Sequence, residues 1–542
     1  MKKLFVVLVV LLVGVLLVAG CGTPASNTTT TAPAPTASTQ AVAANTNAAS
    51  AETTAVTPQS GGILKIRENL PPDMAFGDPL FIIGPMTNRA SIALERLFGI
   101  GSKAGTYSYV LATGYTLAPD KSYYDINLRE GVKFHDGTDF NAAAVKWNLD
   151  RVKSANPAFL SKVSTIEVKG DYTVRLNLSS WDNRILNDLM AQSLGFIISP
   201  TAFEKNGADW VKTHPVGTGP FVYKETQNNQ VIVFVKNTNY WQKGLPYLDG
   251  VESHIITDEM VAVASLQKGE VDITDSLDVP TAALIAANPA FKIHLGNLDM
   301  DGIICMNTVD SSSIWSDVRM RQAFEYALDK DAISKSMSSY AKPVYNVIKG
   351  LENNVDETFT QRKYDKAKAV ELLKAAGHAD GVSFKLYIEA GAAMGPFHNV
   401  TIVLQQQLAD AGFNVQIEPV ERAKMIEITQ GPMTGNDIRM DGLVGSSAAP
   451  IETVMQYLAE SSGNYQGVKR PDAWPTLLNQ ALQTTDPQES LNILLQMDQL
   501  AYDDAMIIPT TTVVMPDAYN AHVQDLTWDI MGFTLAHTWI SQ

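Results

Sequence analysis

The sequence predicts an α/β protein of two or three lobes joined by a hinge. Residues 61–542, which follow a leader and a linker, number 482, and this is more than one hydrophobic core usually organises. Strand and helix patterns alternate along these residues. We expect the chain to cross between lobes at the apolar segments 303–306 and 507–511. Two such crossing strands would form a hinge.

Elements of the first lobe follow from period-two alternation, turn residues and amphipathic spacing. Alternating apolar residues after Gly61 and Gly62 predict the first strand at 63–67. Further strands are predicted at 107–120, 123–129, 163–168, 172–178, 221–235, 250–256 and 271–274. Helices are predicted at 90–98, 141–152, 185–194 and 260–268. This rhythm predicts an α/β lobe.

The second lobe is predicted to begin after Asn307. Strands are expected at 383–388 and 414–419, and helices at 318–328, 332–337, 366–376, 400–411 and 491–503. Gly377 stands where a glycine typically ends a helix. The apolar, β-branched residues 507–514 predict a strand that runs back to the first lobe.

The amino-terminal residues have the pattern of a lipoprotein leader. Lys2 and Lys3 precede an uncharged apolar run at 4–18, which suits a secretory signal and is shorter than the ~20 residues of a spanning helix. Residues 17–21 resemble a lipobox, so we expect cleavage after residue 20 and acylation of Cys21 by fatty chains such as palmitate, which would anchor the protein to the membrane. A soluble secreted protein cut nearby, or an uncleaved membrane anchor, is the alternative. Residues 22–60 carry one charge, Glu52, and predict a disordered linker.

Charge and cysteine content exclude several classes of protein. The net charge of −16 becomes −18 when Lys2 and Lys3 leave with the leader, which argues against nucleic acid as a partner. Cys21 and Cys305 are the two cysteines, so no intramolecular disulfide is expected. Cys305 lies in an apolar segment and is predicted to be a buried small hydrophobe. Without a heptad pattern or a long exposed edge, a monomer is expected.

No residue pattern predicts catalysis. The chain lacks His-Glu-x-x-His, Gly-x-Ser-x-Gly and phosphate-loop patterns, and its eight histidines are scattered singly. We therefore expect no enzyme, no cofactor and no metal site. His135 and His214 are interpreted as structural residues. Asp317 is well placed to cap the helix that follows, and Arg319 and Arg321 are interpreted as pairing across the lobe.

A turn rich in proline and glycine is the most specific motif. Residues 214–221 read His-Pro-Val-Gly-Thr-Gly-Pro-Phe, a backbone path that few other residues could follow. After the turn, the chain continues with Asn-Thr-Asn-Tyr-Trp at 237–241 and Gly-Glu-Val-Asp at 269–272. Before the turn, residues 128–137 read Leu-Arg-Glu-Gly-Val-Lys-Phe-His-Asp-Gly. This succession resembles the family 5 extracellular solute-binding proteins, the receptors of peptide, dipeptide and nickel ABC importers. Further blocks agree at 306–308, 317–323, 364–377 and 404–420.

The resemblance implies a two-lobed fold of the periplasmic-binding-protein type II, with an extra domain inserted in the first lobe and the ligand enclosed between the lobes. The implied division of the chain is a signal peptide at 1–20, a lipidated cysteine and linker at 21–60, the first lobe at 61–98, an inserted subdomain at 99–213, the first lobe again at 214–305, the second lobe at 306–507, and a return to the first lobe at 508–542. As in the family, Tyr240, Trp241 and Tyr247 are interpreted as packing residues.

The loop after residue 443 departs from the family pattern. Family members that bind peptides carry there a tryptophan and an aspartate that neutralises the amino terminus of the peptide. This chain has Ser446 at about the position of that aspartate and no tryptophan, and the alternation of the strand places Asp441 on the neighbouring face. A buried ammonium without a carboxylate costs on the order of several kcal/mol, which argues against ordinary peptide binding. The small residues at 445–449 suit an uncharged, bulky or oxygen-rich ligand.

Eight residues are expected to wall the ligand site: Asn69, Phe76, Met306, Asn307, His398, Leu443, Ser446 and Ser447. The expected function is a lipid-anchored, extracytoplasmic receptor, in the periplasm or on the outer face of the cytoplasmic membrane. It would capture a peptide-like solute, an oligosaccharide or a chelate, close around it and deliver it to an ABC permease. Nickel bound through His398 is an alternative ligand. A solute sensor, or a secreted hydrolase or chaperone of the same fold, is the alternative function.

Overall fold

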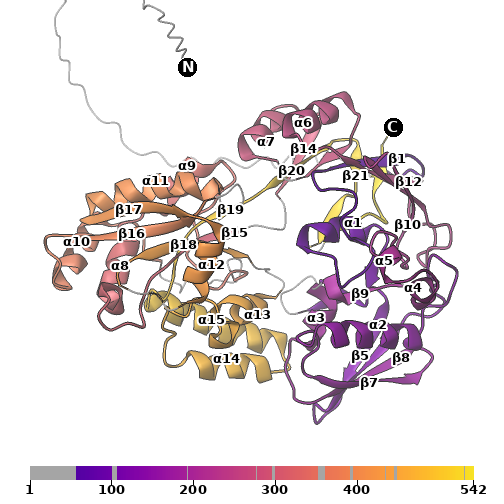
Figure 1. Cartoon of the computed structure of the whole chain (residues 1–542), viewed down its shortest axis with the longest axis horizontal. Coiled ribbons are helices and arrows are strands. Elements are labelled where there is room, and N and C mark those ends of the chain that lie inside the picture. Colours follow the sequence, from indigo (N-terminus) through magenta and orange to yellow (C-terminus); the bar gives the residue numbers. More distant parts are fainter. Residues whose placement is uncertain are drawn as a thin grey trace, which may run out of the picture. The chain divides into compact units, whose positions relative to one another are not determined.

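The computed structural model describes residues 57–100, 106–191, 193–275, 277–295, 300–351, 361–390, 395–431, 433, 435–444, 449–529 and 532–541. Cys21, Ser446 and Ser447 lie outside the described residues. Within residues 57–542 the chain forms two α/β lobes, each with its own sheet, and an inserted subdomain with a third sheet (Figure 1). The predicted fold class is therefore confirmed.

The first lobe is built on a seven-stranded sheet in the order β10-β11-β12-β1-β13-β20-β14. The alternating residues after Gly62 form β1, which runs parallel to β12 and β13. The strands are β1 (Ile63–Glu68), β10 (Phe221–Gln227), β11 (Val231–Lys236), β12 (Gly250–Ile255), β13 (Ile273–Thr274), β14 (Phe291–Leu295) and β20 (Pro516–Asn520). Helices α6 (Glu259–Lys268) and α7 (Val279–Ala286) pack beside it, and short C-terminal strands follow at β21 (Val523–Gln524), β22 (Thr527–Asp529), β23 (Gly532–Thr534) and β24 (Trp539–Ile540).

The inserted subdomain has a four-stranded antiparallel sheet in the order β5-β6-β8-β7. Helix α2 packs against this sheet, and it begins where Asn141 accepts a hydrogen bond from the Ala144 amide at 3.0 Å. Its elements are β3 (Phe98–Ile100), β4 (Tyr107–Tyr109), β5 (Ala112–Leu117), β6 (Tyr123–Leu128), α2 (Ala142–Ala155), β7 (Val163–Gly170), β8 (Thr173–Leu178), α3 (Ile185–Ala191), α4 (Pro200–Asn206) and α5 (Ala208–Val211). These elements span residues 98–211, and the boundaries at 99 and 213 stay a prediction.

The predicted helix at 90–98 is wrong beyond Ser91. Helix α1 (Thr87–Ser91) ends there, and the chain continues as β2 (Glu95–Arg96) and β3. β2 pairs with β9 (Phe196–Ile197), and β3 pairs with β4. Pairing with segments that are distant in the sequence thus overrides local helical propensity here.

The turn at 214–221 depends on close backbone approach. A Cβ atom added to Gly217 would lie 2.4 Å from the Ala93 carbonyl oxygen, and one added to Gly219 would lie 2.7 Å from the same atom. Neither glycine has a positive φ. Thr218, between them, donates a hydrogen bond of 2.7 Å to the Glu95 carboxylate. Glycine is therefore required for space and not for an unusual φ.

The Glu95 carboxylate ties the turn to the Tyr-Trp pair of the motif. It accepts hydrogen bonds from the Tyr240 hydroxyl at 2.8 Å and from the Trp241 indole nitrogen at 3.0 Å. Burial raises the pKa of Glu95 to about 7, although these donors oppose the shift. The guanidinium of Arg129 lies 4.1 Å from the centre of the Trp241 ring. The motif residues thus hold the first lobe to its inserted subdomain.

His135 and His214 have structural contacts. The His135 Nε2 atom donates to the Gly219 carbonyl at 3.0 Å, and burial lowers the pKa of this histidine to about 4. The His214 ring stacks on Trp210 with 4.3 Å between ring centres. Both histidines therefore fit the structural interpretation.

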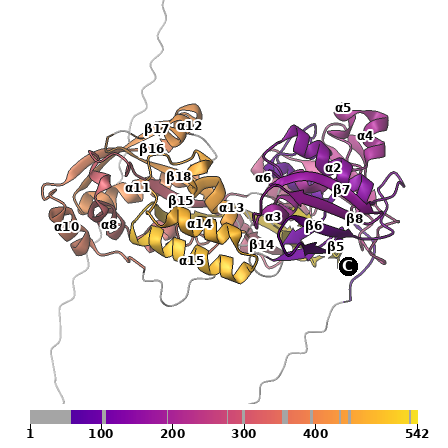
Figure 2. The ribbon, with the colours of Figure 1, turned by 90° about the horizontal axis from the view of Figure 1, so that it is seen from below.

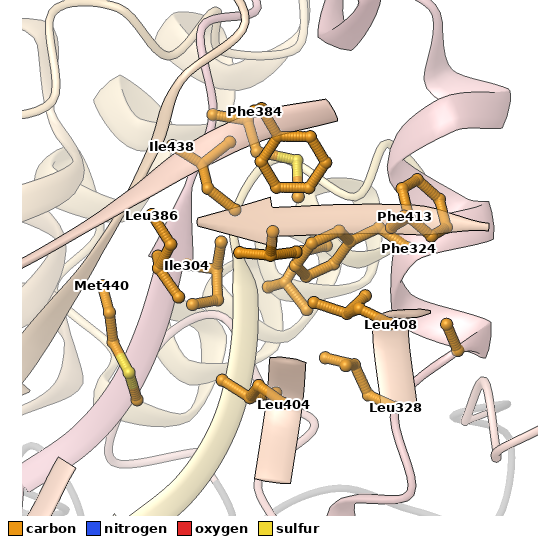
Figure 3. Close-up of a cluster of buried hydrophobic side chains, with 14 of the residues drawn as sticks. Ile304, Phe324, Leu328, Phe384, Leu386, Leu404, Leu408, Phe413, Ile438 and Met440 are labelled. Atoms are coloured by element: carbon orange, nitrogen blue, oxygen red, sulfur yellow. The ribbon is translucent and has the colours of Figure 1, made fainter. Parts of the chain in front are cut away.

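The second lobe contains a five-stranded sheet in the order β17-β16-β18-β15-β19. Alternate residues of β15 enter different cores: Ile304 lies with the helices α8, α9, α10 and α11, and Ile303 lies with α14 and α15. Figure 3 shows the first of these cores, in which Phe324, Phe384 and Phe413 are packed together with Ile304. In Figure 2, α14 and α15 are seen in front of the sheet.

The elements of the second lobe agree well with the predicted ones, apart from the helices α12, α13 and α14, which were not predicted. They are β15 (Met300–Cys305), β16 (Val382–Glu389), β17 (Phe413–Val420), β18 (Ile438–Val444), β19 (Ile508–Val513), α8 (Val318–Tyr326), α9 (Lys330–Met337), α10 (Lys366–Ala375), α11 (Gly395–Asp410), α12 (Arg422–Gln430), α13 (Pro450–Thr453), α14 (Trp474–Gln483) and α15 (Pro487–Asp503). Asp317 caps α8, as predicted, by accepting from the Arg319 amide at 2.9 Å. Gly377 follows α10 with φ of 93°.

The chain passes between the two large sheets twice, but not at the predicted residues. β14 belongs to the first sheet and β15 to the second, so the first passage precedes Met300. β19 belongs to the second sheet and β20 to the first, so the other passage follows Val513. The apolar segments that suggested the crossings are neighbouring strands of the second sheet, with Ile304 paired to Ile508. Strands buried on both faces read as continuous apolar runs, which explains the error.

Candidate functional site

A cavity of about 80 Å³ lies between the inserted subdomain and the second lobe. The subdomain contributes Tyr107, Tyr115, Tyr124, Trp181, Asn183, Leu186 and Asn187. The second lobe contributes Ala449, Pro450, Ile451, Thr484, Thr485, Pro487, Ser490, Leu491 and Leu494. Both parts of the body therefore contribute walls to this cavity.

Four aromatic side chains form the subdomain wall. Tyr107 and Tyr115 contact edge to face with ring centres 6.4 Å apart, and Tyr115 and Tyr124 do so at 5.6 Å. Trp181 continues the row, 5.7 Å from Tyr124. Strands β4, β5 and β6 supply the tyrosines, and the loop after β8 supplies the tryptophan. Aromatic faces of this kind suit apolar, planar or cationic groups.

Asparagine side chains supply the polar part of this wall. Asn187 accepts a hydrogen bond from the Tyr107 hydroxyl at 2.7 Å and donates one to Glu452 at 3.1 Å. The Oδ1 atom of Asn183 is buried and has no hydrogen-bond partner among the described residues. This oxygen can accept a hydrogen bond from a donor in the cavity.

Three carboxylates surround one arginine beside the cavity. Arg184 pairs with Asp182 at 2.7 Å and with Glu452 at 3.7 Å. Burial, followed by repulsion from Glu452, raises the pKa of Asp188 to about 7. Burial also raises the pKa of Glu452. Because burial and repulsion between the carboxylates already disfavour their ionised forms, this side of the cavity disfavours a further anionic group.

The predicted ligand loop adjoins the cavity along the chain. Residues 445–448, which include Ser446 and Ser447, lie outside the described residues. Ala449 and the first residues of α13 follow them directly and line the cavity. The predicted loop and the observed cavity are therefore neighbours in sequence.

Three predicted wall residues are core residues in this structure. Phe76 is 0 % exposed in the first-lobe core, where its ring contacts Tyr223 and Phe234. Met306 and Leu443 are each 1 % exposed, on opposite faces of the second-lobe sheet. The structure does not bring these three side chains together, and their contact with a ligand stays a prediction.

The remaining predicted residues are also dispersed. Asn69 is exposed. Asn307 is buried, and its Nδ2 atom donates to the Gly435 carbonyl at 3.3 Å. The Nε2 atom of His398 donates to the Glu389 carbonyl at 3.0 Å. None of the predicted residues within the described part of the chain lines the aromatic cavity.

The described residues bear on two further properties, metal binding and membrane insertion. No group of three or more His, Cys, Asp or Glu residues among them is placed to hold a metal ion. In the same residues, no helix combines the length and apolar character needed to cross a bilayer.

The aromatic cavity was not predicted from the sequence. Five tyrosines stand between residues 107 and 124, and this density within predicted strands is the signal that was available. It could not identify the opposite wall, because the residues of α13 and α15 come from a distant part of the chain. A pocket formed by such separate segments has no local sequence pattern.

Comparisons with known proteins agree with these features. Residues 106–465 match the family described as bacterial extracellular solute-binding proteins, family 5 Middle. The glutathione-binding protein GsiB of Salmonella typhi is 30% identical over 460 residues, which cover 80% of this chain and 85% of that protein. GsiB of Escherichia coli O157:H7 is 29% identical over the same length and shares of the two chains.

Solved structures share the fold. HbpA2 of Haemophilus parasuis superposes with a TM-score of 0.79 at 19% identity, covering 89% of this chain and 100% of that one. DppA of Helicobacter pylori, in complex with the peptide STSA, gives 0.67 at 21% identity, covering 89% and 99%. With the family match over most of the body and curated relatives at this level of identity, the chain belongs to family 5 of the bacterial extracellular solute-binding proteins, the substrate-binding proteins of ABC importers.

Proposed function

We propose that the protein is a lipid-anchored, extracytoplasmic receptor that captures a solute between its lobes and delivers it to an ABC permease. The observation that carries this proposal is the cavity to which the inserted subdomain and the second lobe both contribute walls. A solute that touches both walls binds the closed arrangement better than an open one. Such a solute shifts the population towards closure, and its release follows when the lobes separate.

We further propose a short peptide or a glutathione-like tripeptide as the solute. Curated relatives are named for glutathione binding, and structural neighbours hold the peptides STSA and Met-Leu. The cavity, at about 80 Å³, is smaller than the ~300 Å³ at the lower end of small-molecule sites. It would take one side chain of the solute, next to Tyr115 and Trp181.

Several predicted wall residues remain in this proposal. Asn69, His398, Ser446 and Ser447 would supply polar contacts, and Asn307 would support them from the second lobe. Leu443 would support the wall from the core that it shares with Ile451 and Leu494, and Phe76 and Met306 would shape the two lobes from cores of their own. The absence of a carboxylate at Ser446 means that the amino group of the solute is held elsewhere than in the family's peptide receptors.

Calorimetry of the purified protein tests the solute class. We expect heat of binding with reduced glutathione or with Met-Leu, and recovery of the unchanged compound by mass spectrometry. Binding of an oligosaccharide or a nickel chelate alone would contradict the peptide class. Turnover of a bound compound would contradict the receptor function.

A tyrosine pair tests the location of the site. The Tyr115→Ala variant should weaken binding about tenfold, because it removes the middle of the aromatic wall. Tyr109→Ala is the matched control, since Tyr109 is 48 % exposed and does not line the cavity. Equal affinity in both variants would place the solute outside this cavity.

The two cysteines test the membrane anchor. A Cys21→Ser variant should lose the incorporation of labelled palmitate and appear in the soluble fraction of cells. Cys305→Ser is the control. Because Cys305 is buried, this variant should still carry the palmitate label on Cys21. Labelled Cys21→Ser protein in the membrane fraction would contradict lipidation at this residue.

A further inference from the structure

The loop after β8 caps the carboxyl end of α14 across the junction. The last carbonyl groups of a helix have no partner within that helix. In α14, the Ala481 carbonyl accepts from the Asn183 side chain at 2.7 Å, and the Leu482 carbonyl accepts from the Asn183 amide at 3.1 Å. The Gln483 carbonyl accepts from the Trp181 indole at 3.1 Å. Donors from the subdomain thus complete a helix of the second lobe.

The subdomain also supplies the positive charge that this helix end lacks. α14 has no basic residue in its last turn, although a cation there is favourable because of the helix dipole. The ammonium group of Lys121 donates to the Gln483 carbonyl at 2.8 Å. In return, the Gln483 side chain donates to the Trp181 carbonyl at 3.1 Å. The contact is therefore reciprocal and specific in its geometry.

A second contact joins the same loop and helix α3 to α13. Arg184 pairs with Glu452 at 3.7 Å, and Asn187 donates to the same carboxylate at 3.1 Å. Both residues stand directly beside the cavity. The two contacts therefore hold the walls of the cavity on either side.

The cores on the two sides of this junction are separate. The apolar cluster of the subdomain contains no residue of the second lobe, and the cluster around α14 and α15 contains no residue of the subdomain, within the described chain. The hydrogen bonds of Lys121, Trp181 and Gln483 are solvent-exposed. Exposed hydrogen bonds can be exchanged for bonds to water at little net cost, so this junction can open without exposing a core.

We propose that Trp181, Asn183 and Lys121 form a reversible clasp with the end of α14, which holds the cavity shut. This inference rests on the proposed function for its role in retaining a solute, but the clasp itself requires no solute. By linking the subdomain to the second lobe, it adds a contact to the two chain passages that join the sheets. Its strength sets the closed fraction of the free protein.

Spin-label distances test the clasp directly. Labels are placed at Lys169→Cys on β7 and Gln496→Cys on α15, both exposed positions, in the full chain carrying Cys21→Ser. The clasp variant is Lys121→Met with Gln483→Ala, because neither residue lines the cavity. We expect one narrow distance in the parent and a second, longer distance in the variant, with the ratio of closed to open molecules lowered about tenfold.

A matched control separates the clasp from general effects of losing polar side chains. Lys133→Met with Gln488→Ala removes the Lys133 pair to Asp139 at 2.5 Å and the Gln488 bond to Asn492 at 3.0 Å, each within one side of the junction. This variant should keep the parent distance. An identical distance distribution in the clasp variant and the control would overturn the proposal.

Hydrogen exchange provides a second measurement that needs no label. The Asn183 amide bonds to the Leu482 carbonyl, so peptides covering residues 179–187 should exchange about tenfold faster in the clasp variant. Equal exchange would overturn the clasp. Both measurements are made without solute, so a failure of the proposed transport function leaves their result intact. If the protein binds its solute, but the clasp variant has the same label distances and the same hydrogen exchange as the parent, the clasp is refuted and the proposed function stands.

Discussion

The core of the second lobe and the junction with the inserted subdomain each contain a tryptophan in contrasting surroundings. Trp315 is 0 % exposed, and its ring contacts Phe324, Phe384 and Phe413. Trp181 is half-buried and packs against Tyr124, and its indole donates to a backbone carbonyl of the other side. The first environment excludes water and stabilises the fold. The second environment is accessible to water and stabilises a closed arrangement that can open again.

The two tryptophans should respond very differently to truncation. Trp315→Ala should lower the free energy of unfolding by about 4 kcal/mol, because it opens a cavity in a dry core. Trp181→Ala should lower it by about 1 kcal/mol, since the subdomain core remains closed without it. Urea unfolding followed by circular dichroism measures both values. Equal losses would show that the junction is as much a core as the second-lobe sheet.

The turn at 214–221 extends the comparison to backbone packing. Gly217→Ala should cost about 2 kcal/mol, because the new Cβ would collide with Ala93. Gly114→Ala is the control, since nothing lies within 4 Å of a Cβ added there. Thermal unfolding of the two variants gives the difference. If Gly217→Ala left the stability unchanged, the backbone of the first lobe would have to move aside as easily as the junction opens.

Asp188 makes the junction sensitive to pH. Its pKa is raised from 3.8 to about 7 in the folded protein, so the folded state binds this proton more tightly than the unfolded state. Stability therefore falls as the pH rises from about 4 to 7, by at most ~1.4 kcal/mol per unit from this group. In Asp188→Asn, this part of the slope should disappear, and the variant should gain stability relative to the parent above pH 7.

Unfolding measured between pH 4 and pH 8 checks the role of Asp188. Asp150→Asn, on the exposed face of α2, serves as the control and should keep the slope of the parent. An unchanged slope in Asp188→Asn would mean that the carboxylate is solvated in solution. Water would then reach the junction in solution, although the acidic side chains are buried in the structure.

The smallest expected effect concerns Cys305, whose thiol should not react with a thiol reagent in the native protein. Burial raises the pKa of its thiol to about 12, and its side chain lies in the core around α14 and α15. In the Cys21→Ser chain, a thiol reagent should react only after denaturant is added. Reaction of the native protein within minutes would indicate that this core opens as readily as the junction.

Much of the fold was predictable because its signals are local. Amphipathic and alternating patterns predicted α2, α10, β16 and β17 to within a few residues, and Asp317 was recognised as a helix cap. The segment at 90–98 failed because Glu95 and Arg96 pair with residues 196–197. The crossings failed because strands buried on both faces look alike whether they join lobes or lie within one sheet.

The candidate site was less predictable than the fold. Phe76, Met306 and Leu443 were predicted from their places after the first strand, at the expected crossing and beside the expected ligand loop. Their burial in separate cores is decided by strand alternation and by the helices that cover each sheet. The aromatic wall was visible only as a cluster of tyrosines. Its partner wall, beginning at Ala449, is brought to it by contacts between distant segments.

By itself the sequence determined the α/β class, the lobes, the turn at 214–221 and membership of a solute-binding family, because these depend on periodicity and on motifs a few residues long. Only the tertiary structure decided which carbonyl groups at the end of α14 receive donors from Asn183 and Lys121. Those partners lie in a different part of the chain, and their meeting depends on how the subdomain and the second lobe pack. The cavity and the clasp therefore belong to the folded protein and not to any one segment.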